Sequence, residues 1–118
     1  MRVLVCGGRG FPDAAFLNSE LDRLHAIHHF KVLIEGCARG ADHLAGLWAN
    51  ASDVERLKFP ADWKGLGHRA GYIRNLQMLR KGNPNLVIAF PGGKGTAHIT
   101  RIARGANIPV LALSGRGN

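Results

Sequence analysis

Residues 3–10 have the sequence VLVCGGRG, a short apolar run that ends in a glycine-rich loop. Consecutive apolar residues followed by glycines are typical of a strand buried on both faces. Pro12 and Asp13 then open a helix, because proline fits the first helical turn and an acidic side chain is favourable at the positive end of the helix dipole. Strand, glycine loop and helix together predict the first unit of an α/β fold.

The same unit recurs along the chain. Further strands are expected at 31–35, 54–59, 86–90 and 108–113, with 54–59 the weaker, edge strand. The helices expected between them are 41–50, 69–81 and one that follows Thr96, and a polar loop is expected at 60–67. Continuous apolar strands that alternate with amphipathic helices indicate a parallel sheet covered on both faces. We therefore predict one domain over 1–113, a three-layer, Rossmann-like, doubly wound parallel sheet of about five strands, followed by a polar tail at 114–118.

Composition narrows the class of protein further. The 118 residues are 46% hydrophobic and contain no apolar run of the ~20 residues that a membrane helix needs. Cys6 and Cys37 form no CxxC pair, so we expect a reducing, cytoplasmic setting in which both are small buried hydrophobic residues. Sixteen Lys and Arg against eight Asp and Glu give a net charge of +8, which favours an anionic partner.

Three glycine clusters follow predicted strands, at 7–10, 36–40 and 91–96. In doubly wound sheets, ligands bind beyond the carboxyl ends of the strands. Glycines let the backbone approach a ligand closely, and the free N–H groups of the helix that follows suit a phosphate. We expect Thr96 to cap its helix and to offer a hydroxyl. The predicted phosphate-binding residues are Gly7, Gly8, Arg9, Gly36, Arg39, Gly40, Gly92, Gly93, Lys94, Gly95 and Thr96.

The motif PGGKGT at 91–96 differs from two well-known nucleotide loops. It is not a Walker A loop, GxxxxGK[ST], and its spacing is not that of GxGxxG. ATP hydrolysis and NAD-dependent hydride transfer therefore have no motif support, and we expect neither a cofactor nor a metal ion.

A second informative stretch runs from Trp63 to Asn75. Arg69 and Arg74 flank the start of a predicted helix, and the planar guanidinium suits phosphate or carboxylate. Asn75 is expected to contact a base edge or a ribose hydroxyl. Trp63 has two interpretations, either stacking on a base or holding its loop against the core.

These motifs together resemble the YspA-like branch of the SLOG superfamily. The resemblance rests on GGR at 7–9, GCARGAD at 36–42, FPADW at 59–63, AGYIRN at 70–75 and FPGGKGT at 90–96, which span nearly the whole chain. The superfamily includes LOG-type phosphoribohydrolases, which are lysine-decarboxylase-like and act on nucleoside monophosphates, and the DNA-uptake protein DprA. The resemblance implies a Rossmann-like fold and a site for a nucleotide or a nucleotide-derived ligand.

One position departs from the LOG pattern. LOG enzymes carry PGGxGTxxE, whose glutamate takes part in cleaving the N-glycosidic bond, whereas this chain has Ile99 there. Isoleucine can neither stabilise an oxocarbenium-like sugar nor activate water. Asp42 and Asp62 are the candidate catalytic substitutes, with the alternatives that Asp42 caps a helix and that Asp62 is a turn residue or a salt-bridge partner.

Three functions follow from these observations. The leading hypothesis is a nucleotide-binding protein, acting as a sensor or in nucleotide processing. The first alternative is N-glycosidic hydrolysis of nucleoside monophosphates. The second is weak binding of single-stranded nucleic acid, which the charge and the relationship to DprA favour, although one Tyr and two Trp offer few stacking platforms. The dimers of the related enzymes suggest a homodimer.

Overall fold

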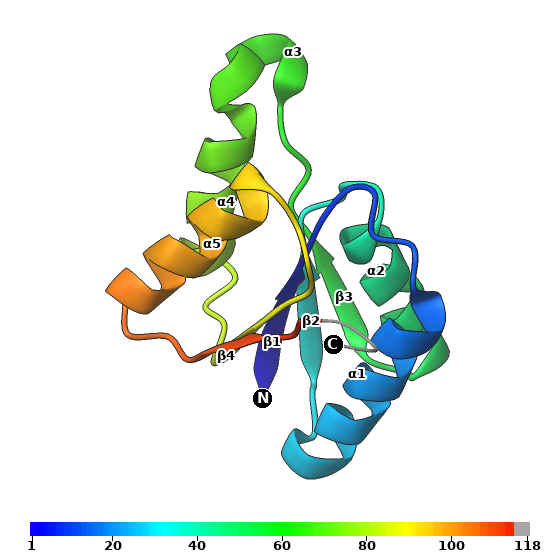
Figure 1. Ribbon diagram of the computed structural model, residues 1–118. Helices are drawn as coiled ribbons and strands as arrows, with labels where there is room; N and C mark the ends of the chain where they lie inside the picture. Colours follow the sequence, from blue (N-terminus) through cyan, green and yellow to red (C-terminus); the bar gives the residue numbers. More distant parts are fainter. Residues whose placement is uncertain (115–118) are drawn as a thin grey trace.

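The computed structural model describes residues 1–114 and contains a five-stranded parallel sheet (Figure 1). The strand order is β3-β2-β1-β4-β5. The strands are β1 (Arg2–Cys6), β2 (Val32–Glu35), β3 (Glu55–Lys58), β4 (Leu86–Ala89) and β5 (Val110–Ala112). Leu4 of the central strand pairs with Ile34 on one side and with Val87 on the other.

Helices cover both faces of this sheet, as Figure 1 shows. α1 (Ala14–His28) and α2 (Ala41–Ala51) lie on one face, and α4 (Ala70–Arg80) and α5 (Lys94–Gly105) lie on the other. Successive side chains of a strand point to opposite faces. Val3 and Val5 accordingly pack with the α1–α2 layer, whereas Leu4 and Cys6 pack with the α4–α5 layer. The three-layer α/β prediction is confirmed.

The connections place a topological switch at the centre of the sheet. The chain passes outward from β1 to β2 and β3, and then crosses to the other side of β1 to form β4 and β5. The loops that follow β1 and β4 therefore leave neighbouring strands toward opposite faces. A crevice at the carboxyl ends of such strands is where open α/β sheets bind ligands.

Two sequence predictions about this edge were wrong. The segment predicted as a polar loop contains a one-turn helix, α3 (Trp63–Leu66), followed by a 3-10 turn, η1 (Gly67–Arg69). The side chain of Asp62 caps α3 by accepting a hydrogen bond from the Gly65 N–H at 3.0 Å. Thr96 is not the cap of the last helix, because α5 begins at Lys94 with Gly93 as its N-cap and Thr96 lies in the first turn.

The cysteines differ from each other. Cys6 is buried, and this burial, with the charge of Asp42, raises the pKa of its thiol to about 12. Cys37 lies in the loop after β2, where its φ is 62°, and contrary to the prediction it is exposed. Within residues 1–114, no helix combines the length and the apolar character that crossing a bilayer requires. All of the predicted polar tail except Ser114 lies outside the described residues.

Candidate functional site

The three glycine loops meet at one edge of the sheet and touch through their backbones. The Gly8 N–H donates to the Pro91 carbonyl at 2.8 Å, and the Gly8 carbonyl accepts from the Ala41 N–H at 3.2 Å. A Cβ on Gly40, whose φ is +72°, would lie 2.2 Å from the Gly8 oxygen. A Cβ on Gly92 would lie 2.7 Å from the Gly8 nitrogen. Some of these glycines therefore serve contact between loops rather than contact with a ligand.

A cavity of about 370 Å³ opens beside this junction, and we call it the central cavity. Its cationic lining comes from three elements, namely Arg9 after β1, Arg74 on α4 and Lys94 on α5. Asp42 is the one acidic residue among the described residues that line it. The volume lies within the ~300–1,000 Å³ range typical of small-molecule sites.

The N-terminal turn of α5 forms part of the cavity wall. A Cβ on Gly93 or Gly95 would meet no other described atom within 4 Å, so both glycines border open space. The first N–H groups of a helix have no acceptor within it, and no side chain of the described residues caps this one. Lys94 places a cation at the positive end of the helix dipole, where an anion is favoured. The turn therefore has both the donors and the charge that an anionic group would satisfy.

Aromatic side chains form another part of the wall. Trp63 and Tyr72 are 47% and 46% exposed, and both line the central cavity. The guanidinium carbon of Arg9 lies 5.0 Å from the Trp63 ring centroid, a cation–π arrangement. Tyr72 meets His98 edge to face, with ring centroids 4.5 Å apart. Burial, with the charge of Arg101, lowers the pKa of His98.

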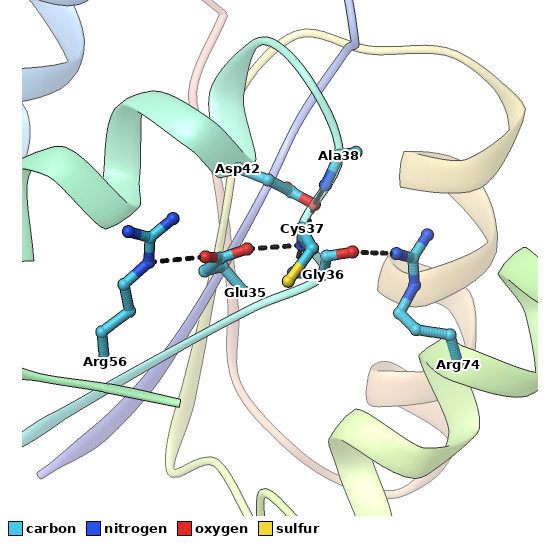
Figure 2. Close-up of polar contacts among 7 residues, drawn as sticks. All are labelled: Glu35, Gly36, Cys37, Ala38, Asp42, Arg56 and Arg74. Atoms are coloured by element: carbon cyan, nitrogen blue, oxygen red, sulfur yellow. Dashed lines mark hydrogen bonds and ion pairs between the residues drawn. The ribbon is translucent and has the colours of Figure 1, made fainter. Parts of the chain in front are cut away.

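The buried side chain of Glu35 anchors the loop after β2, and Figure 2 shows its contacts. One of its carboxylate oxygens accepts from the Nε of Arg56 at 2.7 Å, and the other accepts from the N–H of Cys37. Gly46 leaves room for this pair, since a Cβ there would lie 2.3 Å from the Arg56 guanidinium. Glu35 and Arg56 thus form an ion pair whose carboxylate is fully buried.

Asp42 and Arg74, which both line the central cavity, also hold this loop (Figure 2). One oxygen of Asp42 accepts from the N–H groups of Gly36 and Ala38, each at 3.2 Å, and Nη1 of Arg74 donates to the Gly36 carbonyl. Burial raises the pKa of Asp42 to about 6, although its hydrogen bonds and the charge of Arg74 oppose this shift. Burial also lowers the pKa of Arg74, and the neighbouring charge of Arg9 lowers it further. Asp42 therefore braces the loop and does not cap α2.

Asn75 joins α4 to α5. It is 3% exposed, and its side-chain oxygen accepts from Nε of Arg74 at 3.0 Å. Its Nδ2 donates to the Gly95 carbonyl at 3.3 Å and lies 3.0 Å from Nδ1 of His98. The amide predicted to contact a base or ribose thus bonds to three groups of the protein, although Asn75 does line the cavity.

The structure brings most of the predicted site residues together, but not all of them. The central cavity is lined by Gly7, Gly8, Arg9, Asp42, Arg74, Asn75, Gly93, Lys94, Gly95 and Thr96. Gly36 and Arg39 line a smaller neighbouring cavity. Gly40 and Gly92 pack against Gly8, and Asp62 and the exposed Arg69 lie outside the lining of both cavities.

Sequence reasoning missed several lining residues, namely His68, Gly71, Tyr72 and Met78. Tyr72 had a detectable signal, because it is a large aromatic residue two positions before Arg74 near the start of the predicted helix. His68 and Met78 lie outside the motifs quoted above, and Gly71 has no side chain that would mark it as a site residue. Within residues 1–114, no group of three or more His, Cys, Asp or Glu side chains is arranged to hold a metal ion.

Comparisons with known proteins agree with this architecture. A model of the YspA, cpYpsA-related SLOG family matches residues 1–65, more than half of the chain. The chain is also 38% identical over 118 aligned positions to the Gene 61 protein of Mycobacterium phage D29, covering 93% of this chain and 94% of that protein. With its α/β fold and the motifs that surround the central cavity, the chain belongs to the YspA, cpYpsA-related SLOG family.

Proposed function

We propose that this chain binds a nucleotide or a nucleotide-derived ligand in the central cavity, as a sensor or in nucleotide processing. The observation that carries the proposal is the convergence of an uncapped helix N-terminus, three cationic side chains and two half-exposed aromatic rings on one cavity. A phosphate group would lie at residues 93–96, and Trp63 or Tyr72 would contact the base. Membership of the SLOG family supports a nucleotide-related function.

The charge of the cavity supports an anionic ligand. The described lining contains three cationic side chains, those of Arg9, Arg74 and Lys94, and one carboxylate, that of Asp42. A phosphate would accept hydrogen bonds from the α5 N–H groups and from guanidinium nitrogens, and such charge-assisted bonds are stronger than neutral ones. Trp63 and Tyr72 would contribute contact area with little loss of side-chain entropy, since each ring has two rotatable bonds.

Binding fits the cavity better than the LOG type of hydrolysis. Ile99, at the position of the LOG glutamate, lines the central cavity, but its side chain is apolar, 1% exposed and packed against residues of β1 and β4, so this position supplies no carboxylate. Asp62 caps α3 and lies outside the cavity lining. One observation favours the hydrolytic alternative, namely that Asp42 is a buried carboxylate on the cavity wall with a pKa of about 6.

Titration calorimetry with the common nucleoside monophosphates, cyclic nucleotides and ADP-ribose tests the proposal. We expect Lys94→Ala to weaken the binding of the preferred nucleotide about tenfold, the scale of one charge-assisted hydrogen bond. The substitution should not lower the stability of the fold, because it removes a cation from the N-terminal end of α5, where the helix dipole disfavours positive charge. Lys81→Ala, an exposed lysine at the C-terminal end of α4, is the matched control.

Two results would contradict the proposal: that no nucleotide of the set binds at millimolar concentration, or that Lys94→Ala binds as tightly as the wild type. Chromatography of nucleoside monophosphates incubated with the protein tests hydrolysis separately. Release of free base by the wild type but not by Asp42→Asn would favour the hydrolytic alternative.

A further inference from the structure

A second cavity, of about 270 Å³, adjoins the central cavity, and we call it the side cavity. It lies between the loop after β2 and the segment before α3, and its lining includes Arg39, Cys37 and Pro60. Four residues line both cavities, namely Arg9, Ala38, Trp63 and Arg74. The two spaces therefore share one wall.

The shared wall carries two cationic side chains. Arg9 lies against the Trp63 ring, at 5.0 Å from its centroid. Arg74 uses Nη1 to hold the Gly36 carbonyl and Nε to hold Asn75. A guanidinium has five N–H donors, so these two bonds use only part of its capacity. Both arginines line the two spaces from the same wall.

The side cavity concentrates positive charge more than the central cavity does. Arg9, Arg39 and Arg74 line it, and no acidic residue within residues 1–114 is part of its lining. Burial lowers the pKa of Arg74, the charge of Asp42 opposes this shift, and the charge of Arg9 adds to it. An anion that binds among these three arginines would offset the repulsion between their charges.

We infer that the two cavities form one bipartite site for a nucleotide with two phosphate groups. The first group lies at the N-terminal turn of α5, and the second lies in the side cavity with Arg39, while Arg9 and Arg74 contact both. This inference rests on the proposed function and narrows its ligand to nucleotides with a second phosphate. A nucleoside 5′-diphosphate and a nucleoside 3′,5′-bisphosphate both have this chemistry.

A substitution of Arg39 tests the side cavity alone, because Arg39 lines the side cavity and not the central one. It is exposed, so its removal leaves the core intact. Binding of adenosine 5′-monophosphate, adenosine 5′-diphosphate and adenosine 3′,5′-bisphosphate is measured by calorimetry on the wild type, on Arg39→Ala and on Arg104→Ala. Arg104 is an exposed arginine near the C-terminal end of α5 and provides the matched change in charge.

We expect the wild type to bind at least one of the two doubly phosphorylated probes more tightly than the monophosphate. Arg39→Ala should remove that gain, about tenfold or more, and leave the monophosphate affinity unchanged. The probe whose gain is lost identifies where the ligand carries its second phosphate. Arg104→Ala should bind all three probes as the wild type does.

The inference is overturned if the second phosphate adds no affinity, or if Arg39→Ala weakens all three probes equally. It is also overturned if Arg39→Ala weakens none of them. In each of these cases the monophosphate still binds, so the proposed function stands while the inference fails. Failure of every nucleotide to bind the wild type would instead remove both.

Discussion

Asp42 shows how one buried carboxylate can make folding depend on pH. Its pKa is raised by burial from 3.8 to about 6. Between these values the folded protein holds the proton more tightly than the unfolded chain does. Asp42 therefore contributes up to about 3 kcal/mol to the free energy of unfolding. This contribution is fully present below about pH 4 and is lost as the pH rises through 6.

We expect the free energy of unfolding of Asp42→Asn to lack this decline. Urea unfolding of wild type and variant at intervals from pH 4 to pH 8 measures it, and the difference between the two curves isolates Asp42 from other titrating groups. Asp53→Asn, at an exposed aspartate, is the matched control. Parallel profiles for wild type and Asp42→Asn would show that Asp42 does not hold its proton in the folded state.

Gly40 carries a second prediction at the residue scale. Its φ of +72° is strained for other residues, and a Cβ there would lie 2.2 Å from the Gly8 oxygen. Gly40→Ala should therefore lower the free energy of unfolding by about 2 kcal/mol or more. Chemical denaturation checks this against Gly105→Ala, at a position where a Cβ meets no described atom within 4 Å. Equal stability of the two variants would contradict the contact between these loops.

At the scale of elements, α3 and η1 differ from the rest of the molecule. No residue of 63–69 is buried, and this segment stands away from the sheet at the top of Figure 1. Segments with few buried apolar contacts open at low free-energy cost. We expect their amide hydrogens to exchange about 100-fold faster than those of α2, measured by hydrogen exchange with mass spectrometry.

Nucleotide binding should slow this exchange, because Trp63 and His68 line the central cavity. The amides of α1, which contributes no residue to the cavity lining described above, provide the internal control. Exchange in 63–69 as slow as in α2 without a ligand would contradict the prediction.

At the scale of the whole molecule, the net charge of +8 adds a long-range field to the local contacts. Salt screens such fields, with a Debye length of about 10 Å at 0.1 M. We expect the affinity for the preferred nucleotide to fall at least about threefold between 50 and 300 mM salt. Calorimetry with the corresponding uncharged nucleoside is the control, and an equal salt dependence of both ligands would contradict an electrostatic contribution.

Much of the fold could be predicted from local sequence patterns. Continuous apolar runs such as Val3-Leu4-Val5 and Val87-Ile88 indicate strands that are buried on both faces, not strands with one solvent-exposed face. Because helices are predicted between these strands, a parallel sheet is the expected arrangement. The short helix α3 escaped prediction because one turn has no periodicity, and its only signal was the capping aspartate, Asp62. Cys37 was wrongly predicted to be buried, because the burial of a loop residue depends on which segments pack over it.

The sequence by itself determined the sheet, the two helix layers and the gathering of three glycine loops at one edge, because these follow from hydrophobic patterning and from the geometry of parallel strands. Only the tertiary structure decided which side chains face the cavity. Asn75 bonds to Arg74 and Gly95, and Asp42 braces the loop at 36–38. Arg69 is exposed and lies outside the lining of the cavity that Arg74 lines. The direction of a side chain and its hydrogen-bond partners depend on packing between segments distant in sequence, which local residue patterns do not encode.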